Sequence, residues 1–146
     1  MLALIQRVSR AQVEVEGETV GRIGPGLLAL VCAEPGDDDA RVARMASKLL
    51  AYRVFPDPDG RMNRSLTDVG GELLLVSQFT LAADTGSGLR PSFSGAAAPA
   101  DAERIYRLLV RECAQRHPKG VETGRFRAHM EVSLVNDGPV TFLLRT

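Results

Sequence analysis

The sequence is poor in cysteine, has no tryptophan and carries no net charge. Its two cysteines, Cys32 and Cys113, are far apart and form no C-x-x-C pair, so we expect a reducing compartment rather than a disulfide framework. Eighteen basic and eighteen acidic side chains cancel, which argues against nucleic-acid binding through bulk charge but leaves room for a local basic patch. No apolar run approaches the roughly 18 residues that span a bilayer, so no membrane partner is expected.

Histidine is equally scarce, and the common catalytic motifs are missing. His117 and His129 are the only histidines, and no cysteine or carboxylate stands near them at metal-ligand spacing, so we predict no metal site. The chain has no G-x-S-x-G elbow, no Walker A motif and no G-x-G-x-x-G after a strand. We therefore expect no cofactor, and an enzyme of this sequence must use backbone groups or the substrate itself for much of its chemistry.

The length and the remaining composition are those of an ordinary globular protein. At 146 residues, with 45% hydrophobic and 25% charged residues, the chain predicts one domain spanning residues 1–146. The opening MLALIQRVSR has an apolar part too short for a signal peptide, and Gln6 and Arg7 interrupt it. We expect a soluble, cytoplasmic protein.

The hydrophobic pattern predicts an α+β fold. Short alternating or apolar runs predict strands at 2–8, 12–16, 19–23, 27–33, 72–80, 121–124, 130–135 and 140–144. Two amphipathic helices are predicted at about 37–53 and 99–117, the first with an apolar stripe of Val42, Met45, Leu49 and Tyr52. Because most strand connections are short, we expect a mainly antiparallel or mixed sheet with two helices packed against it.

The central strand from residue 72 carries polar side chains where a buried strand would be apolar. After the run Leu73–Val76 come Ser77, Gln78, Phe79 and Thr80, which on a strand would point alternately to its two faces. A buried polar group without a partner costs about 1–3 kcal/mol, so these groups either bond within the core or line a cavity. The residues alone favour the core hydrogen bond, while the second interpretation makes this strand the floor of a catalytic pocket.

A second unusual segment runs from Asn136 to Thr141. Asp137-Gly138 between two alternating strands is typical of a hairpin turn. Pro139 directly after the glycine is unusual there, because it removes a backbone donor where the next strand begins. A cis Gly138–Pro139 bond is one explanation, but spacing alone favours the hairpin.

Segments along the whole chain resemble the D-aminoacyl-tRNA deacylase family. The matching segments are ALIQRV (3–8), GPGLL (24–28), DGRMNRS (59–65), VSQFTL (76–81), ADT (83–85), RPSF (90–93), ETGRF (122–126) and VSLVNDGPVT (132–141). Their number and order make the resemblance specific.

The resemblance implies a reaction and an assembly. Members hydrolyse the ester that joins a D-amino acid to the terminal adenosine of tRNA. They also remove glycine from mischarged tRNA, because glycine is achiral and is not rejected. It implies a compact, barrel-like sheet and a homodimer with active sites at the subunit interface, which bind the 3′ end of aminoacyl-tRNA. Gly138-Pro139 would be cis, would enter the partner's pocket, would hold the substrate amino group through its carbonyls and would reject L side chains sterically.

The resemblance also implies roles for the other site residues. Backbone N–H groups around Phe79 and Thr80 would stabilise the oxyanion, and the ribose 2′-hydroxyl would help to activate water. Thr80 would orient groups rather than act as the nucleophile, with Gln78 and Ser77 supporting the wall.

Two further positions complete the expected site. Met130 would line the pocket, and Arg7 would brace the Gly138-Pro139 turn. A competing hypothesis is a non-catalytic dimeric module that uses the same pocket to bind RNA ends or small amino-acid derivatives.

Overall fold

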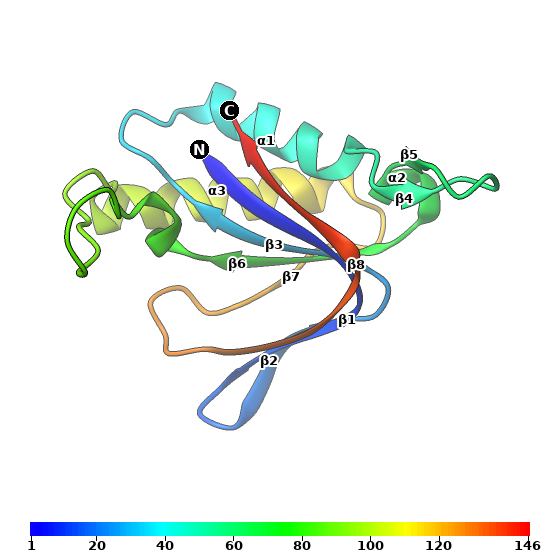
Figure 1. Cartoon of the computed structure of the whole chain (residues 1–146), viewed down its shortest axis with the longest axis horizontal. Coiled ribbons are helices and arrows are strands. Elements are labelled where there is room, and N and C mark those ends of the chain that lie inside the picture. The colour runs from blue at the N-terminus through cyan, green and yellow to red at the C-terminus, as the bar shows by residue number, and fades with distance from the viewer.

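The longest strands, β1 (Leu2–Val15) and β8 (Glu131–Arg145), run antiparallel to each other along almost their whole length (Figure 1). The computed structural model describes all residues from 1 to 146. The sequence predicts two strands at each of these places, and this is wrong. β1 continues through residues 9–10 because β8 pairs with both of its halves, including Arg10 with Val135, while the first half also pairs with β3 and the second with β2.

The predicted hairpin at Asp137-Gly138 is also wrong, because β8 continues past it. Gln6 pairs with Thr141 and Val8 pairs with Asn136, so residues 137–140 stand opposite Arg7 alone. The extra residues bulge out of the ladder, as inserted residues do in antiparallel pairs. The bulge thus displays Gly138-Pro139 on the surface without ending the strand.

The remaining strands complete a six-stranded mixed sheet in the order β2-β1-β3-β6-β7, with β8 pairing with β1. These strands are β2 (Glu18–Ile23), β3 (Gly26–Cys32), β6 (Glu72–Ser77) and β7 (Glu122–Thr123). β6 is parallel to both β3 and β7, and the other pairs are antiparallel. Gly21 of β2 lies so close to β7 that a Cβ there would meet the Thr123 carbonyl, so the sheet is a nearly closed barrel.

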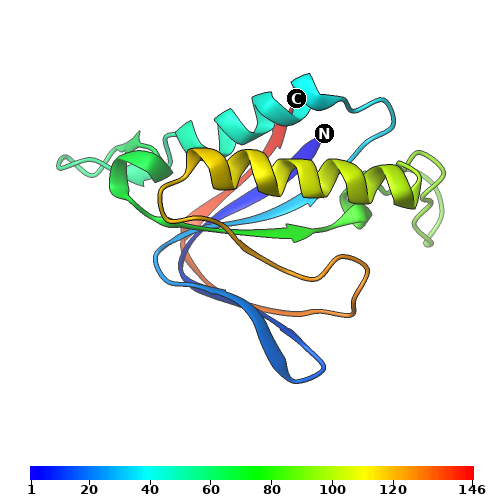
Figure 2. The same cartoon turned by 180° about the vertical axis from the view of Figure 1, so that it is seen from behind.

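Two long helices cover one face of this sheet, α1 (Asp39–Ala51) and α3 (Pro99–Arg116) (Figures 1 and 2). α1 begins where the Asp38 carboxylate accepts a hydrogen bond from the Arg41 N–H at 2.8 Å, which satisfies one of the free donors of the first turn. The predicted stripe of α1 is buried except at Tyr52, which follows the helix and is 38% exposed. The predicted α+β fold and barrel-like sheet are therefore confirmed.

A third, short helix was not predicted. α2 (Leu66–Val69) follows a small hairpin of β4 (Phe55–Pro56) and β5 (Met62–Arg64). Its signal in the sequence is a capping box, in which the Ser65 hydroxyl accepts from the Asp68 N–H and the Asp68 carboxylate accepts from the Ser65 N–H. The pattern is visible in the sequence as Ser-x-x-Asp before Gly70.

Both faces of the central strands are buried, as the apolar runs predicted. On β6, Leu73 and Leu75 point to the core beneath the helices, and Leu74 and Val76 point to a smaller core inside the barrel.

The longest helices are amphipathic rather than apolar, and none could cross a membrane.

Tyr106 of α3 ties the helix layer to the sheet. Its hydroxyl donates a 2.9 Å hydrogen bond to the Leu75 carbonyl of β6, and the same carbonyl accepts from the Gly124 N–H at 3.1 Å. Burial raises the pKa of Tyr106 to about 12, so the phenol stays protonated and can donate.

We expect Tyr106→Phe to lower the free energy of unfolding by about 1 kcal/mol, because a buried hydrogen bond is lost while the Leu75 carbonyl keeps one donor. Urea denaturation followed by circular dichroism measures the change. Tyr52→Phe is the matched control, since Tyr52 is partly exposed and its hydroxyl has no hydrogen bond. Equal losses in the two variants would contradict a role for the Tyr106 hydroxyl.

Candidate active site

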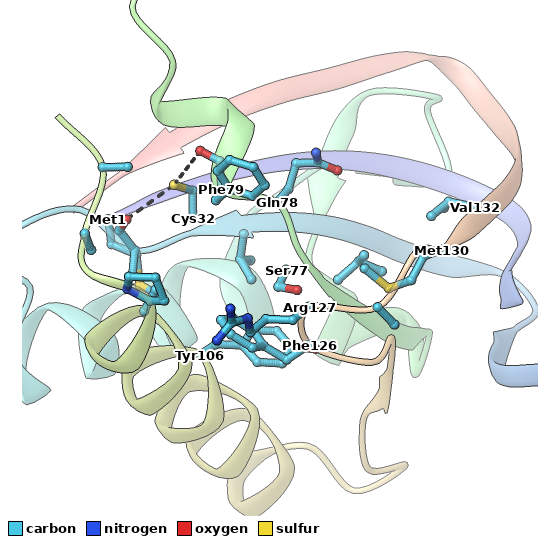
Figure 3. A pocket seen from close by; sticks show the side chains of 18 of the residues that line it. Met1, Cys32, Ser77, Gln78, Phe79, Tyr106, Phe126, Arg127, Met130 and Val132 are labelled. Atoms are coloured by element: carbon cyan, nitrogen blue, oxygen red, sulfur yellow. Dashed lines mark hydrogen bonds between the residues drawn. The ribbon is translucent and has the colours of Figure 1, made fainter. Parts of the chain in front are cut away.

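A cavity of about 540 Å³ opens where β3 and β6 end, beside the N-terminal half of α3 (Figure 3). Its walls come from the ends of β3 and β6, the segment 96–99, α3, and the segment 126–132. The lining is mostly apolar and contains no aspartate or glutamate; its members are Met1, Val31, Cys32, Ala33, Val76, Ser77, Gln78, Phe79, Ala96, Ala97, Pro99, Ala102, Tyr106, Phe126, Arg127, Ala128, His129, Met130 and Val132.

The predicted strand through Thr80 is wrong at its end. β6 stops at Ser77, the Gln78 N–H makes a last 2.7 Å bond to the Val31 carbonyl, and the chain then turns into the 3₁₀ helix η1 (Phe79–Ala82). β3, the partner of β6, ends at Cys32, so no neighbouring strand remains to continue the ladder. The four residues therefore do not alternate between two faces.

The turn brings three of the four predicted residues to the cavity. Ser77, Gln78 and Phe79 line it, whereas Thr80 is exposed just outside. The Gln78 side-chain amide donates to the Thr80 hydroxyl at 2.6 Å, so the two polar groups satisfy each other. The expectation of a hydrogen bond hidden in the core is wrong, because the bond lies on the surface at the rim of the cavity.

The backbone at this rim offers free donors. The N–H groups of Phe79 and Thr80 stand in the first turn of η1, where N–H groups have no partner inside the helix. The hydrogen bonds of the loops and turns include none donated by either group. Two adjacent N–H donors are thus available to an oxygen atom of a ligand.

Aromatic rings and a buried thiol also line the cavity. The rings of Tyr106 and Phe126 lie 5.8 Å apart, and Phe79 packs against Phe93 with 5.1 Å between ring centres. The Cys32 thiol is 3.6 Å from the Phe79 carbonyl, and burial raises its pKa above the usual value. Cys32 therefore stays a neutral thiol, which is a poor nucleophile.

Met130 lines the cavity as expected, next to residues that the sequence did not single out. Its sulfur lies 2.7 Å from where a Cβ on Gly124 would be, so the glycine makes room for it. Arg127 and His129 also line the cavity, on the loop between β7 and β8. The structure brings together no group of three or more histidine, cysteine, aspartate or glutamate side chains that could hold a metal.

Gly138, Pro139 and Arg7 lie away from this cavity. The Gly138–Pro139 bond is cis, as the resemblance implied, and both residues are exposed. Arg7 Nε donates to the Asp137 carbonyl at 2.9 Å and pairs with its carboxylate at 3.0 Å, while Nη1 donates to the Val54 carbonyl at 2.6 Å.

The Asn136 side chain fixes the other side of this bulge. Its amide donates to the carbonyls of Arg7 and Val140, each at 3.0 Å. A Cβ on Gly138 would collide with the Asn136 amide oxygen and the Val140 nitrogen, so only glycine fits here. The predicted site residues therefore form two separate groups within one chain.

Known proteins match the chain over its whole length. A family model described as D-Tyr-tRNA(Tyr) deacylase matches residues 4–145. The D-aminoacyl-tRNA deacylases of Stenotrophomonas maltophilia (strain K279a) and Xanthomonas oryzae pv. oryzae (strain MAFF 311018) are each 68% identical over 145 residues, 99% of both sequences.

Solved structures show the same fold. One described as a c-Myc DNA unwinding element binding protein is 36% identical, with a TM-score of 0.94 over 100% of this chain and 99% of that one. Another, described as a probable eukaryotic D-amino acid tRNA deacylase, is 16% identical and shows the shared fold alone, with a TM-score of 0.81 over 99% and 98% of the chains. On the match of the family model and of these relatives, the chain belongs to the D-Tyr-tRNA(Tyr) deacylase family.

Proposed function

We propose that the protein hydrolyses the ester of D-aminoacyl-tRNA, releasing the D-amino acid and tRNA as a chirality proofreading step in translation. The observation that carries this proposal is the pair of free N–H donors at Phe79 and Thr80, at the rim of a cavity without a carboxylate or a reactive nucleophile. Family membership supplies the substrate class. The proposed reaction needs no metal and no cofactor. Because its substrate is aminoacyl-tRNA, we expect the reaction to take place in the cytoplasm.

The N–H groups of Phe79 and Thr80 form the oxyanion hole in this proposal. When water attacks the ester carbon, the carbonyl oxygen becomes negative and accepts from both donors. One such donor is typically worth about 2.7–4 kcal/mol of transition-state stabilisation. The attacking water is activated with help from the terminal ribose 2′-hydroxyl, so the absence of a carboxylate base from the cavity does not block the reaction.

The side chains around the donors position the substrate. The Gln78–Thr80 hydrogen bond holds the turn in shape, which supports an orienting role for Thr80. Ser77 and Met130 form the wall against which the substrate rests. None of these groups has to exchange a proton with the ester.

A second subunit completes the site. Gly138 and Pro139 lie away from the cavity of their own chain and are exposed on the bulge of β8, which supports their insertion into a partner's cavity. There their carbonyls accept from the ammonium group of the substrate and leave no room for an L side chain. Arg7 holds the bulge by its bonds to Asp137 and Val54.

The outer edge of β8 supports a homodimer. β8 pairs only with β1, so its other edge is unpaired along a 15-residue strand. Long exposed edges favour pairing with another chain. Three apolar side chains on this strand, Val135, Phe142 and Leu143, are each more than a third exposed, which suits a buried interface.

The wild-type enzyme should release D-tyrosine and glycine from charged tRNA and leave L-tyrosyl-tRNA nearly untouched. The steric filter predicts a difference of several orders of magnitude, because an L side chain would overlap the inserted Gly138-Pro139 segment. Deacylation of tRNA labelled in the amino acid measures both rates. Equal rates would contradict the filter, and no turnover of any ester would favour a module that only binds RNA ends or amino-acid derivatives.

Phe79→Pro should lower kcat about 10²- to 10³-fold beyond the loss in Phe79→Leu, because only proline removes the backbone donor. Proline is tolerated at the first position of a helix, where Phe79 stands in η1. Thr80→Ala keeps its N–H and should cost about tenfold, far from the ~10⁶-fold loss of a true nucleophile. If Thr80→Ala abolished turnover while substrate still bound, Thr80 would be the nucleophile instead.

Mixing two inactive variants tests the shared site. Gly138→Ala displaces the bulge, and Phe79→Pro removes an oxyanion donor, so each homodimer should be nearly inactive. Unfolding and refolding the two together should restore about a quarter of the wild-type sites, because each mixed dimer of a two-fold assembly has one intact site. Sites confined to one chain would show no recovery, and Asp84→Ala mixed with either variant serves as the control for refolding.

A further inference from the structure

Arg127 occupies a backbone position that disfavours arginine. The Ala128 N–H bonds to the Arg125 carbonyl at 3.2 Å, so residues 125–128 form a turn, and Arg127 is its third residue with φ of 63°. Turns with positive φ at this position strongly favour glycine. The chain has one other non-glycine residue with positive φ, Glu16, which stands beside Gly17 in the tight connection between β1 and β2.

No contact within the chain compensates for this conformation. Arg127 has no hydrogen bond and no ion pair, and the cavity that it lines contains no carboxylate. By contrast, Arg107 pairs with Glu103 and Arg116 pairs with Glu112, each on its own helix. Residues held in disfavoured backbone conformations cluster at active sites and at ligand-binding segments.

The surroundings of Arg127 indicate the chemistry of that ligand. Figure 3 shows its side chain on the wall that includes Tyr106 and Phe126, in a cavity that is otherwise mostly apolar. Such a cavity suits a flat aromatic base, and a guanidinium beside it suits a phosphate, which it can bind through two parallel N–H donors. A nucleotide combines both groups.

We infer that Arg127 binds the 5′-phosphate of the terminal nucleotide of the substrate. The inference rests on the proposed function, which places the ester at the N–H groups of Phe79 and Thr80. The adenine then lies in the cavity, and the phosphate lies at the side of the cavity where Arg127 stands. Arg127 is a binding and positioning residue that takes no part in the hydrolysis itself.

Arg127→Gly tests the inference, because glycine suits the turn and removes only the guanidinium. Two small substrates are compared: 3′-O-D-tyrosyl-adenosine and its 5′-monophosphate. The variant should raise KM for the phosphate-bearing ester about 10- to 100-fold, the range for a charged hydrogen-bonded contact, with kcat little changed. KM for the nucleoside ester should stay as in the wild type, and the melting temperature should be equal or higher.

Arg125→Gly is the matched control, since Arg125 is an exposed arginine in the same turn and does not line the cavity. It should affect both esters equally. An equal rise of KM for both esters in Arg127→Gly, or a lower melting temperature, would overturn the inference in favour of a structural role.

A binding measurement separates this inference from the proposed activity. Calorimetry with adenosine 5′-monophosphate and with adenosine needs no hydrolysis. We expect the wild type to bind the monophosphate more tightly, and Arg127→Gly to lose that preference. If neither ester were hydrolysed, the proposed function would fail, and the phosphate preference would still decide the role of Arg127. Equal binding of adenosine 5′-monophosphate and adenosine by the wild type would overturn the inference.

Discussion

The pairing of β1 with β8 is the contact on which both groups of site residues depend. At one end, β8 begins directly after Met130, so the ladder fixes the wall of the cavity. At the other end, the mismatch in register opposite Arg7 expels residues 137–140 as the bulge that carries Gly138-Pro139. A shift of β8 by one residue would turn its side chains to the opposite face and move both features together. The strand thus fixes the position of the Gly138-Pro139 bulge relative to the cavity wall at Met130 within one chain.

The end of β6 is the second constraint. A parallel strand inside the sheet has every N–H and carbonyl paired, and it offers nothing to a ligand. Where β3 ends, β6 loses its partner, and the 3₁₀ turn leaves Phe79 and Thr80 with free N–H groups. The same turn lets the Gln78 side chain reach the Thr80 hydroxyl. Free donors therefore arise from sheet topology and need no special side chain.

The dependence of the free N–H groups on sheet topology explains which features could be predicted from the sequence. The helices α1 and α3 and most strands follow from hydrophobic period, because burial of one face dictates that period. The position of the N–H donors was predicted from family resemblance, whereas the pattern of polar residues placed Ser77 to Thr80 on a strand that in fact ends at Ser77. Strand ends depend on the length of the neighbouring strand, which lies far away in sequence. The merging of the predicted strands into β1 and β8 was missed for the same reason.

The cavity lining was missed for a different reason. Val31, Ala97 and Tyr106 have the residue types of a core, and only the missing neighbour distinguishes a cavity wall from a packed interior. Arg127 was missed because a left-handed backbone at a non-glycine residue leaves no trace in a hydrophobic pattern.

A site made of backbone donors and apolar walls has a particular consequence for specificity. With no carboxylate in the cavity, the electrostatic field near the ester comes from N–H dipoles and from cations such as Arg127. In the proposed mechanism these groups attract the oxyanion and the phosphates of any aminoacyl-tRNA, whichever enantiomer it carries. Under that proposal discrimination comes from shape at the α-carbon, and the glycine-containing bulge held by Arg7 and Asn136 is suited to that task. Because the bulge does not line the cavity of its own chain, the proposed mechanism requires a second subunit to bring the selective segment to the reacting ester.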